Sequence, residues 1–350
     1  MDEVRIGFVG VGFMGQVAHL KNYVTVPGCR VVAICELRQG LGKKVASRYG
    51  VPRVYSSHTE MLDAEELDGI VAAQPFRRHS VLVPELLRAG VPVFIEKPLA
   101  ASVEAGERIV SAVHRSGTWL MVGYHKRSDP ATAWAKAEID RLKQSRELGP
   151  LRYVRILMPA GDWIAGGDSD VIRTDEPVPD LAVEPPPGDM DEQTHKAYLA
   201  FVNYYIHQVN LMRYMLGEPY RVTYADPSGV VLATESRSGV PGIIEMSPYR
   251  TTLGWHESVL VAFERGYVKV QLPAPLTSNC AGTVEILRDP GGGTAPQGIQ
   301  PHLPSVHAMR QQAANFVSAI RGESRPPCEA AEALEDLKVA RDYMRLAQGR

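Results

Sequence analysis

The sequence has few cysteines and no long apolar run. The four cysteines, at positions 29, 35, 280 and 328 of 350, form neither a CxxC pair nor a Cys/His spacing, which argues against a zinc site or a disulfide framework. No apolar run approaches the roughly 18 residues of a membrane span, and the acidic N-terminus leading into a strand is unlike a signal peptide. We therefore expect a metal-free protein of the cytoplasm with no membrane partner.

The charge is also nearly balanced. Lys and Arg total 38, Asp and Glu total 40, and the formal net charge is -2, which excludes a surface built throughout for nucleic acid. Apolar residues make up 45% and charged residues 22%, the composition of an ordinary globular protein. A chain of 350 residues has room for two or perhaps three domains.

Strands and helices alternate through the first 124 residues. Short apolar runs that read as buried strands occupy residues 4–10, 30–36, 53–55, 69–73, 91–95 and 118–123. Helical patterns separate most of them. The alternation predicts a Rossmann-type α/β domain over residues 1–124, with a doubly wound parallel sheet.

A glycine-rich turn follows the first expected strand. It reads Gly10-Val11-Gly12-Phe13-Met14-Gly15, which is GxGxxG in the strand–turn–helix context that dinucleotide binding requires. The first glycine permits a tight turn, the second admits a pyrophosphate, and the third lets helix and strand pack closely. We expect Gly10, Gly12, Phe13, Met14 and Gly15 to contact the cofactor phosphates at the start of a helix.

An acid lies where the fingerprint expects one. Glu36 ends the second strand about 20 residues beyond the glycines, where a carboxylate can accept hydrogen bonds from the adenosine ribose. It would also repel a 2′-phosphate, so NAD is preferred over NADP. Arg38 lies two residues further on and could instead turn toward such a phosphate.

The fifth strand runs directly into Glu96-Lys97-Pro98. An N-terminal GxGxxG with EKP at this position resembles the Gfo/Idh/MocA oxidoreductases, which oxidise or reduce sugars and cyclitols with NAD(P). The resemblance implies that Lys97 lies beside the nicotinamide and orients the substrate hydroxyl, while Pro98 holds the loop. A lysine at the carboxyl end of a parallel strand is also well placed to stabilise a developing alkoxide.

Two further segments resemble the family. Gln74, Pro75 and His79 lie in a segment similar to its TPNxxH segment, in which Pro75 and His79 match while Gln74 and Phe76 depart, and this implies a loop over the pyrophosphate and nicotinamide ribose. Residues 123–127 resemble its GFNxR turn, with Tyr124 as the aromatic and His125 in place of asparagine, which implies a substrate contact at Tyr124 and a cofactor contact at His125. An ordinary inter-domain linker is an equal alternative for this second segment.

From residue 125 the pattern changes. Alternating strands are expected at 151–158, 220–225, 229–234, 243–246, 258–264 and 267–272, with a loop at 290–301 and closing helices from about 306. Residues 125–350 are therefore predicted to form an α+β substrate-binding and oligomerisation domain with a large, mostly antiparallel sheet. By analogy with the family, it would assemble a homodimer or homotetramer.

The candidate base lies on a helix expected from about His195 to Gly217. His207 matches the histidine of the family's DxxxH pattern and has the pKa range of a general acid/base. Asn203 stands where the family has the aspartate and would share a helix face with His207. Asn210 likewise replaces a second acid, so an imidazolium would be less stabilised than in the family. A purely structural histidine remains the alternative.

A long segment rich in Pro and Gly lies between these elements. Residues 161–196 carry ten acids against only Arg173 and Lys196, so a cationic substrate such as an amino sugar is one hypothesis, with a solvated lid or an oligomer arm as the alternative. Asp162, Trp163 and Arg173 are candidate substrate contacts. A second polar and aromatic cluster that could reach the site consists of Tyr249, Arg250, Trp255 and His256.

These observations predict an NAD-dependent dehydrogenase or reductase. The substrate would be a secondary alcohol or ketone of a sugar, amino sugar or cyclitol, with Lys97, His207 and Asn203 as the catalytic set. The non-redox alternative, an NAD-dependent glycosidase or a ligand sensor on the same scaffold, stays open because the usual acid is missing at Asn203.

Overall fold

The computed structural model describes residues 3–349, so residues 1, 2 and 350 of the two expected domain ranges lie outside the described part. The chain forms two compact units. The first contains the chain up to Tyr124 together with Gly167–Leu199 and Met309–Leu337. The second contains His125–Gly166, Ala200–Ala308 and the chain from Lys338 onward.

The first unit is built on a six-stranded parallel sheet with strand order β3-β2-β1-β4-β5-β6. Its strands are β1 (Val4–Val9), β2 (Cys29–Cys35), β3 (Arg53–Tyr55), β4 (Gly69–Ala72), β5 (Val93–Glu96) and β6 (Leu120–Gly123). The four-residue strands β4, β5 and β6 are buried throughout, as expected of a sheet covered on both faces. The order reverses between β1 and β4, which makes the carboxyl ends of these strands the switch point where ligands bind.

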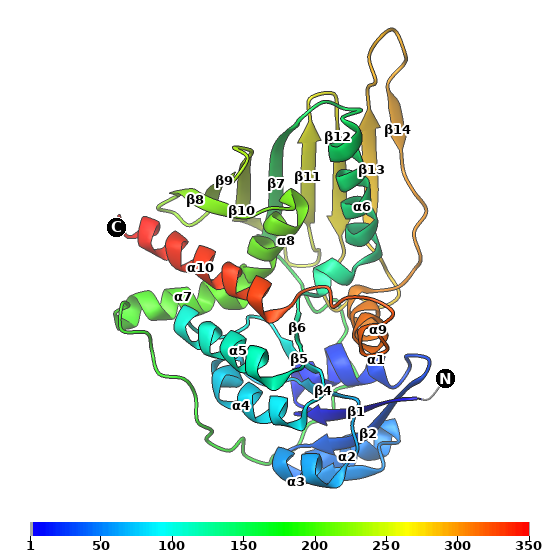
Figure 1. Cartoon of the computed structure of the whole chain (residues 1–350), viewed down its shortest axis with the longest axis vertical. Helices are drawn as coiled ribbons and strands as arrows, with labels where there is room; N and C mark the ends of the chain where they lie inside the picture. Colours follow the sequence, from blue (N-terminus) through cyan, green and yellow to red (C-terminus); the bar gives the residue numbers. More distant parts are fainter. Residues whose placement is uncertain (1–2, 350) are drawn as a thin grey trace. The chain divides into compact units, whose positions relative to one another are not determined.

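Helices cover both faces of this sheet (Figure 1). They are η1 (Gly15–Leu20), α1 (Lys21–Tyr23), α2 (Gln39–Tyr49), α3 (His58–Ala64), η2 (Phe76–Arg78), α4 (His79–Leu86), η3 (Leu87–Ala89), α5 (Val103–Ser116) and α9 (Ala308–Ile320). Helix α5 illustrates the local signals: the Ser102 side chain accepts from Ala105 N–H at its start, and Gly117 ends it with φ +71°.

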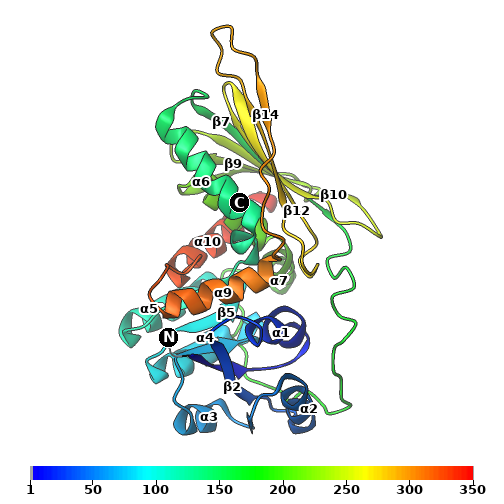
Figure 2. The same cartoon turned by 90° about the vertical axis from the view of Figure 1, so that its right-hand side faces the viewer.

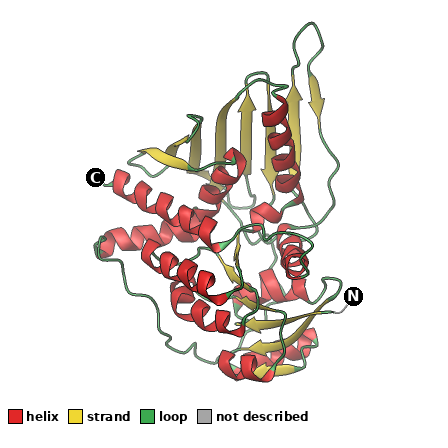
Figure 3. Cartoon of the chain, viewed as in Figure 1, coloured by secondary structure: helices red, strands yellow, loops and turns green. Residues whose placement is uncertain are grey.

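The second unit is built on an eight-stranded sheet with strand order β14-β13-β12-β11-β7-β10-β9-β8. Its strands are β7 (Leu151–Ala160), β8 (Tyr220–Ala225), β9 (Val231–Ser236), β10 (Pro241–Arg250), β11 (Glu257–Phe263), β12 (Gly266–Leu272), β13 (Thr283–Arg288) and β14 (Gln297–Ile299). All neighbours are antiparallel except β7 and β10. Figure 3 shows these strands as one broad sheet.

Burial alternates along the strands of this second sheet. In β11 every second residue from Glu257 to Phe263 is buried, which is the pattern of a sheet with one covered face. The second unit also contains η4 (His125–Ser128), α6 (Pro130–Ser145) and α8 (Ile206–Leu216), and α6 and α8 pack against the sheet. Two more helices, α7 (Glu192–Tyr204) and α10 (Ala330–Ala347), contribute residues to both units.

The predicted fold class is confirmed, but three details differ from expectation. Residues 167–199 and 309–337 belong to the first unit rather than to a domain spanning 125–350. The physical reason for the later segment is Phe316 of α9, which is fully buried and packs edge-on against Phe94 and Tyr23 of the first unit's core. The expected loop at 290–301 contains the short strand β14, which pairs with β13.

The third difference is that the single helix expected from about His195 to Gly217 is two helices, broken at Tyr205. The N–H of Tyr205 bonds the carbonyl of Phe201, but the Tyr205 carbonyl accepts from both Gln208 and Val209, so the chain tightens for one turn. Tyr205 itself stays in the right-handed helical region, with φ -93° and ψ -4°, so a common face for Asn203 and His207 stays a prediction.

Candidate functional site

The glycine-rich turn joins β1 to the first helical turns, which begin at Phe13. Gly10 has φ +91°, and a Cβ there would collide with the Gln74 side chain and come within 2.8 Å of the Ala73 carbonyl. A Cβ on Gly15 would lie 2.6 Å from the Gly10 carbonyl oxygen. The backbone turn is thus as tight as the fingerprint demands, and Gly12, Phe13 and Met14 remain partly exposed beside it.

Glu36 ties the turn to the end of β2. Its carboxylate accepts from the N–H of Val11 at 3.0 Å and from that of Arg38 at 3.1 Å. The Arg38 guanidinium also donates to it, through Nε at 2.9 Å, and its Nη2 would lie 3.3 Å from a Cβ on Gly12. The expected acid therefore lies against the glycine-rich turn, and Arg38 is turned toward Glu36.

His79 joins the loops that follow β4 and β5. The ring is fully buried, with Nδ1 at 3.1 Å from the Pro98 carbonyl and 3.2 Å from that of Leu99, and Nε2 at 3.3 Å from the Gln74 carbonyl. Burial lowers the pKa of His79 and outweighs these carbonyls, which raise it. A neutral imidazole thus fixes the backbone next to Lys97.

The Gln74 side chain closes the same edge of the sheet. Its amide donates to the Val9 carbonyl at 3.3 Å and accepts from Arg78 Nη1 at 2.9 Å. Pro75 precedes the short turn η2. The glutamine that departs from the family segment therefore links the end of β1 with the loop after β4.

Glu96 anchors the other side of Lys97. Its carboxylate accepts from His19 Nε2 at 2.6 Å and from the Lys97 N–H at 3.2 Å. Burial alone would raise the pKa of Glu96, but the hydrogen bond from His19 and the charges of His19 and Lys97 outweigh it and lower this pKa. The Lys97–Pro98 peptide bond is cis, and the Lys97 side chain is partly exposed. His19 was not predicted from the sequence, because its hydrogen-bond partner Glu96 lies 77 residues away along the chain.

Two histidines meet in the second unit. The rings of His125 and His207 pack edge to face with centroids 4.6 Å apart. His207 is half-buried near the start of α8, whereas Asn203 is exposed near the end of α7. Tyr124, a predicted substrate contact at the end of the first unit's first segment, is buried with 1% of its surface exposed.

Asn210 has a clear partner. Its amide oxygen accepts from Arg127 Nε at 2.6 Å in a buried position, and the Arg127 guanidinium lies 4.6 Å from the centre of the Tyr214 ring. The asparagine in place of the second acid is thus a neutral acceptor for a buried guanidinium.

A buried carboxylate lies next to these residues in the second unit. Glu257 accepts from Lys126 Nζ, from Gln208 Nε2 at 2.7 Å and from Trp255 Nε1 at 3.1 Å. Lys126 and Glu257 are 4% and 3% exposed. Trp255 was expected near the site, but Lys126, Gln208 and Glu257 could not be identified from the sequence, because the ion pair spans 131 residues.

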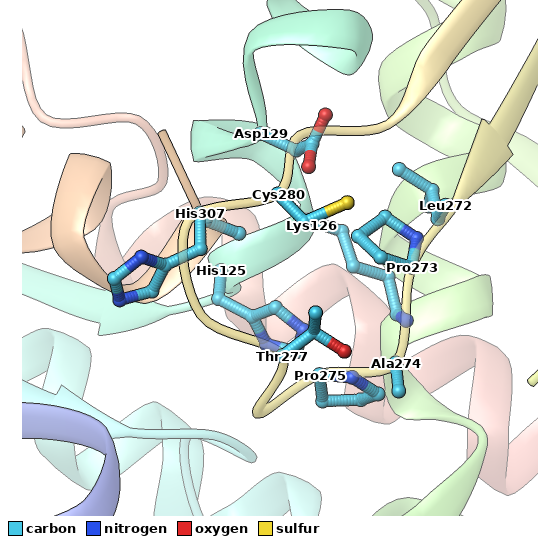
Figure 4. Close-up of a pocket in the computed structure, with 11 residues that line it drawn as sticks. His125, Lys126, Asp129, Leu272, Pro273, Ala274, Pro275, Thr277, Cys280 and His307 are labelled. Carbon is cyan, nitrogen blue, oxygen red and sulfur yellow. The ribbon is translucent and has the colours of Figure 1, made fainter. Parts of the chain in front are cut away.

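A small, open depression lies beside η4. Figure 4 shows His125 and Lys126 on one side, with His307 nearby and the chain from Pro273 to Thr277 passing over them. Asp129 also lines it, although its carboxylate is committed to the N–H groups of Ala131 and Gly282. The Lys126 ammonium in this lining is already paired with Glu257.

The three substrate contacts predicted in the acidic segment are divided between the two units. Asp162 and Trp163 lie in the second unit, whereas Arg173 lies in the first and is exposed. Asp162 accepts from the N–H groups of Ile164 and Ala165, both at 3.0 Å, and so holds a turn.

The other four residues singled out near this site are on and after β10. Tyr249 and His256 contact each other at 3.4 Å, Trp255 donates to Glu257, and Arg250 is exposed. Within the described residues, no group of three or more His, Cys, Asp or Glu side chains is arranged to hold a metal ion, and no helix is long and apolar enough to cross a bilayer.

Comparison with known proteins agrees with this arrangement. Residues 4–124 match the model of the oxidoreductase family with an NAD-binding Rossmann fold, GFO_IDH_MocA. The scyllo-inositol 2-dehydrogenase (NAD(+)) of Bacillus subtilis is 26% identical over 261 residues, which cover 70% of this chain and 67% of that protein.

Solved structures share the fold over the full length. A putative NADPH-dependent oxidoreductase from Desulfitobacterium hafniense has a TM-score of 0.78 at 15% identity, covering 100% of this chain and 97% of that one. A putative myo-inositol dehydrogenase from Sinorhizobium meliloti has a TM-score of 0.69 at 22% identity, covering 99% and 98%.

The fold and the glycine-rich turn with its acid define a dinucleotide-binding oxidoreductase. Residues 4–124 match the NAD-binding Rossmann fold of the Gfo/Idh/MocA oxidoreductase model, and the whole chain is similar in fold to the solved structures named above.

Proposed function

We propose that this protein transfers a hydride between NAD and a secondary alcohol or ketone of a cyclitol, sugar or amino sugar. The observation that carries the proposal is the glycine-rich turn held by Glu36 at the end of β2, at the same sheet edge as the Lys97 loop. The name of the Bacillus subtilis relative favours a cyclitol.

The preference for NAD follows from Glu36. A dinucleotide in the family's orientation places its adenosine ribose at the end of β2, where this carboxylate would accept from the ribose hydroxyls. A 2′-phosphate would meet a buried negative charge whose nearest cation, Arg38, is already bonded to it.

The chain's own residues have distinct roles in this proposal. Bound NAD supplies the hydride acceptor or donor. Lys97 holds the substrate oxygen and stabilises its negative charge, and His207 takes or returns the hydroxyl proton. Asn203 binds a substrate hydroxyl without carrying charge. His79 and Glu96 keep the Lys97 backbone in place.

The test is NADH formation over a panel of cyclitols, sugars and amino sugars, with wild type beside Lys97→Ala and His207→Ala. We expect turnover of one substrate class by wild type and a loss of roughly 10²–10⁴-fold in kcat for each variant. Retained NADH binding by both variants serves as the control for folding. Full activity in either variant would remove the role assigned to that residue.

The second candidate is a non-redox activity on the same scaffold, and the exposed amide of Asn203 in place of an acid favours it. It predicts NAD binding with no net change in NADH in either direction, together with either cleavage of a glycoside or ligand binding alone. We also propose a homodimer or homotetramer, formed through the half-exposed face of the eight-stranded sheet; light scattering of the full chain tests it.

A further inference from the structure

Residues 167–191, here called the strap, form an extended segment of the first unit (Figure 2). Its first anchor is on Gln16, just after the glycine-rich turn. The Gln16 side chain accepts from the Ile172 N–H at 2.9 Å and donates to the Ile172 carbonyl at 3.1 Å. The oxygen and the nitrogen of the Gln16 amide are therefore both hydrogen-bonded to the backbone of the strap.

The later anchors lie beyond β4. The Glu184 N–H donates to the Arg77 carbonyl at 2.9 Å, and Arg78 donates to the Ala182 carbonyl at 3.4 Å. The Glu184 side chain is 4% exposed, with Ser102 and Ser80 beside it, and burial raises its pKa. Because Gln16 follows β1 and Arg77 follows β4, the strap crosses the carboxyl edge of the sheet, where a dinucleotide binds.

Between these anchors, Glu176 lies at the start of α2. Its two carboxylate oxygens accept from the N–H groups of Gly40 and Leu41, both at 2.8 Å, and Thr174 donates to it at 3.1 Å. A Cβ on Gly40 would come within 2.7 Å of the carboxylate, so the glycine makes room for it. Hydrogen bonds from Gly40 and Leu41 lower the pKa of Glu176, and a negative charge suits a helix N-terminus.

The groups around Glu176 are those that would receive a 2′-phosphate. NADP-binding members of this fold class place an arginine near the end of β2 to accept it. Here the arginine is Arg38, which is hydrogen-bonded to Glu36. The neighbouring backbone donors are the N–H groups of Gly40 and Leu41 at the start of α2, and both donate to Glu176. Two carboxylates, from positions 140 residues apart, therefore occupy the phosphate-binding donors.

We infer that Glu176 is a specificity-determining residue that excludes NADP, by placing a carboxylate of the strap on the donors that a 2′-phosphate would need. The inference rests on the proposed dinucleotide function. A 2′-phosphate would have to displace Glu176 and would face the like charge of Glu36. NAD has a hydroxyl in place of the 2′-phosphate and so brings no negative charge to Glu176 and Glu36.

The test measures dissociation constants of NADH and NADPH by the fluorescence of the bound reduced nicotinamide, using the full chain. Glu176→Gln keeps the side-chain size and removes the charge. In this variant we expect the dissociation constant of NADPH to fall by about tenfold or more, and that of NADH to change by less than about threefold.

Two controls isolate the position. Asp175→Asn removes the same charge from the adjacent exposed residue and is expected to leave the NADPH/NADH ratio as in wild type. Glu184→Gln removes a carboxylate at a second position of the strap, keeps the backbone bond to Arg77, and is expected to leave the NADPH/NADH ratio as in wild type. An unchanged ratio in Glu176→Gln, or an equal shift in either control, would overturn the inference. Failure of wild type to bind either nucleotide would instead contradict the proposed function.

Discussion

Glu257 shows what a single buried charge contributes to this protein. Its carboxylate accepts from Lys126, Gln208 and Trp255, and the first two of these donors lie 131 and 49 residues away along the chain. Burying such an ion pair costs solvation free energy. Removing one partner costs more, because the remaining buried ion has no water to replace its partner.

We therefore predict that Glu257→Ala lowers the free energy of unfolding by about 3–5 kcal/mol, since it leaves the Lys126 ammonium buried without its counter-charge. The matched control is Glu245→Ala, which removes a carboxylate from Arg155 on the same sheet, where both side chains are partly exposed. That pair should contribute less than about 1 kcal/mol. Urea denaturation of the full chain measures both, and equal losses would contradict the role given to burial.

At the scale of elements, the loops after β4 and β5 are held together by one neutral imidazole. The native pKa of His79 is below its usual value of about 6.5, so between the two values the unfolded chain binds more protons than the native one. Stability due to His79 is thus complete above the unfolded value and is lost as the pH falls below it. For one proton, the slope reaches at most about 1.4 kcal/mol per pH unit.

We expect the free energy of unfolding of wild type to fall between pH 7.5 and about 5.5, and the His79→Asn variant to show a shallower fall despite lower stability at neutral pH. Urea titrations at several pH values provide the measurement. His114→Asn, at an exposed position of α5, is the control and should retain the wild-type slope. A slope in His79→Asn as steep as in wild type would show that other groups govern the acid response.

The elements also show how far the sequence alone could lead. The turn at Gly10 and the acid at Glu36 were predictable because each follows from a strand–turn–helix pattern within about 30 residues. The break at Tyr205 was not, because the helical periodicity continues through it and only the local hydrogen bonds reveal the tight turn. Glu176 was counted as one of ten acids in a loop, and nothing nearby in the sequence points to Gly40.

At the scale of the whole molecule, the two units are interleaved along the chain. Residues 309–337, which follow the strands of the second unit in the sequence, belong to the first unit. Sequence patterns could not assign this segment, because an amphipathic helix specifies an apolar partner without identifying it. Phe316 identifies it here, through ring contacts with Phe94, Tyr23 and Trp119.

We predict that Phe316→Ala in the full chain destabilises the N-terminal sheet although the mutation lies near the C-terminus. Removing this fully buried ring should cost about 3–5 kcal/mol, so amide hydrogen exchange should accelerate in β1 and β5 and stay near wild type in β7 and β12. Phe263→Ala, in β11, is the reciprocal control and should accelerate exchange in β7 and β12 only. If Phe316→Ala instead loosened the eight-stranded sheet, the helix would belong to the second unit, as the sequence had indicated.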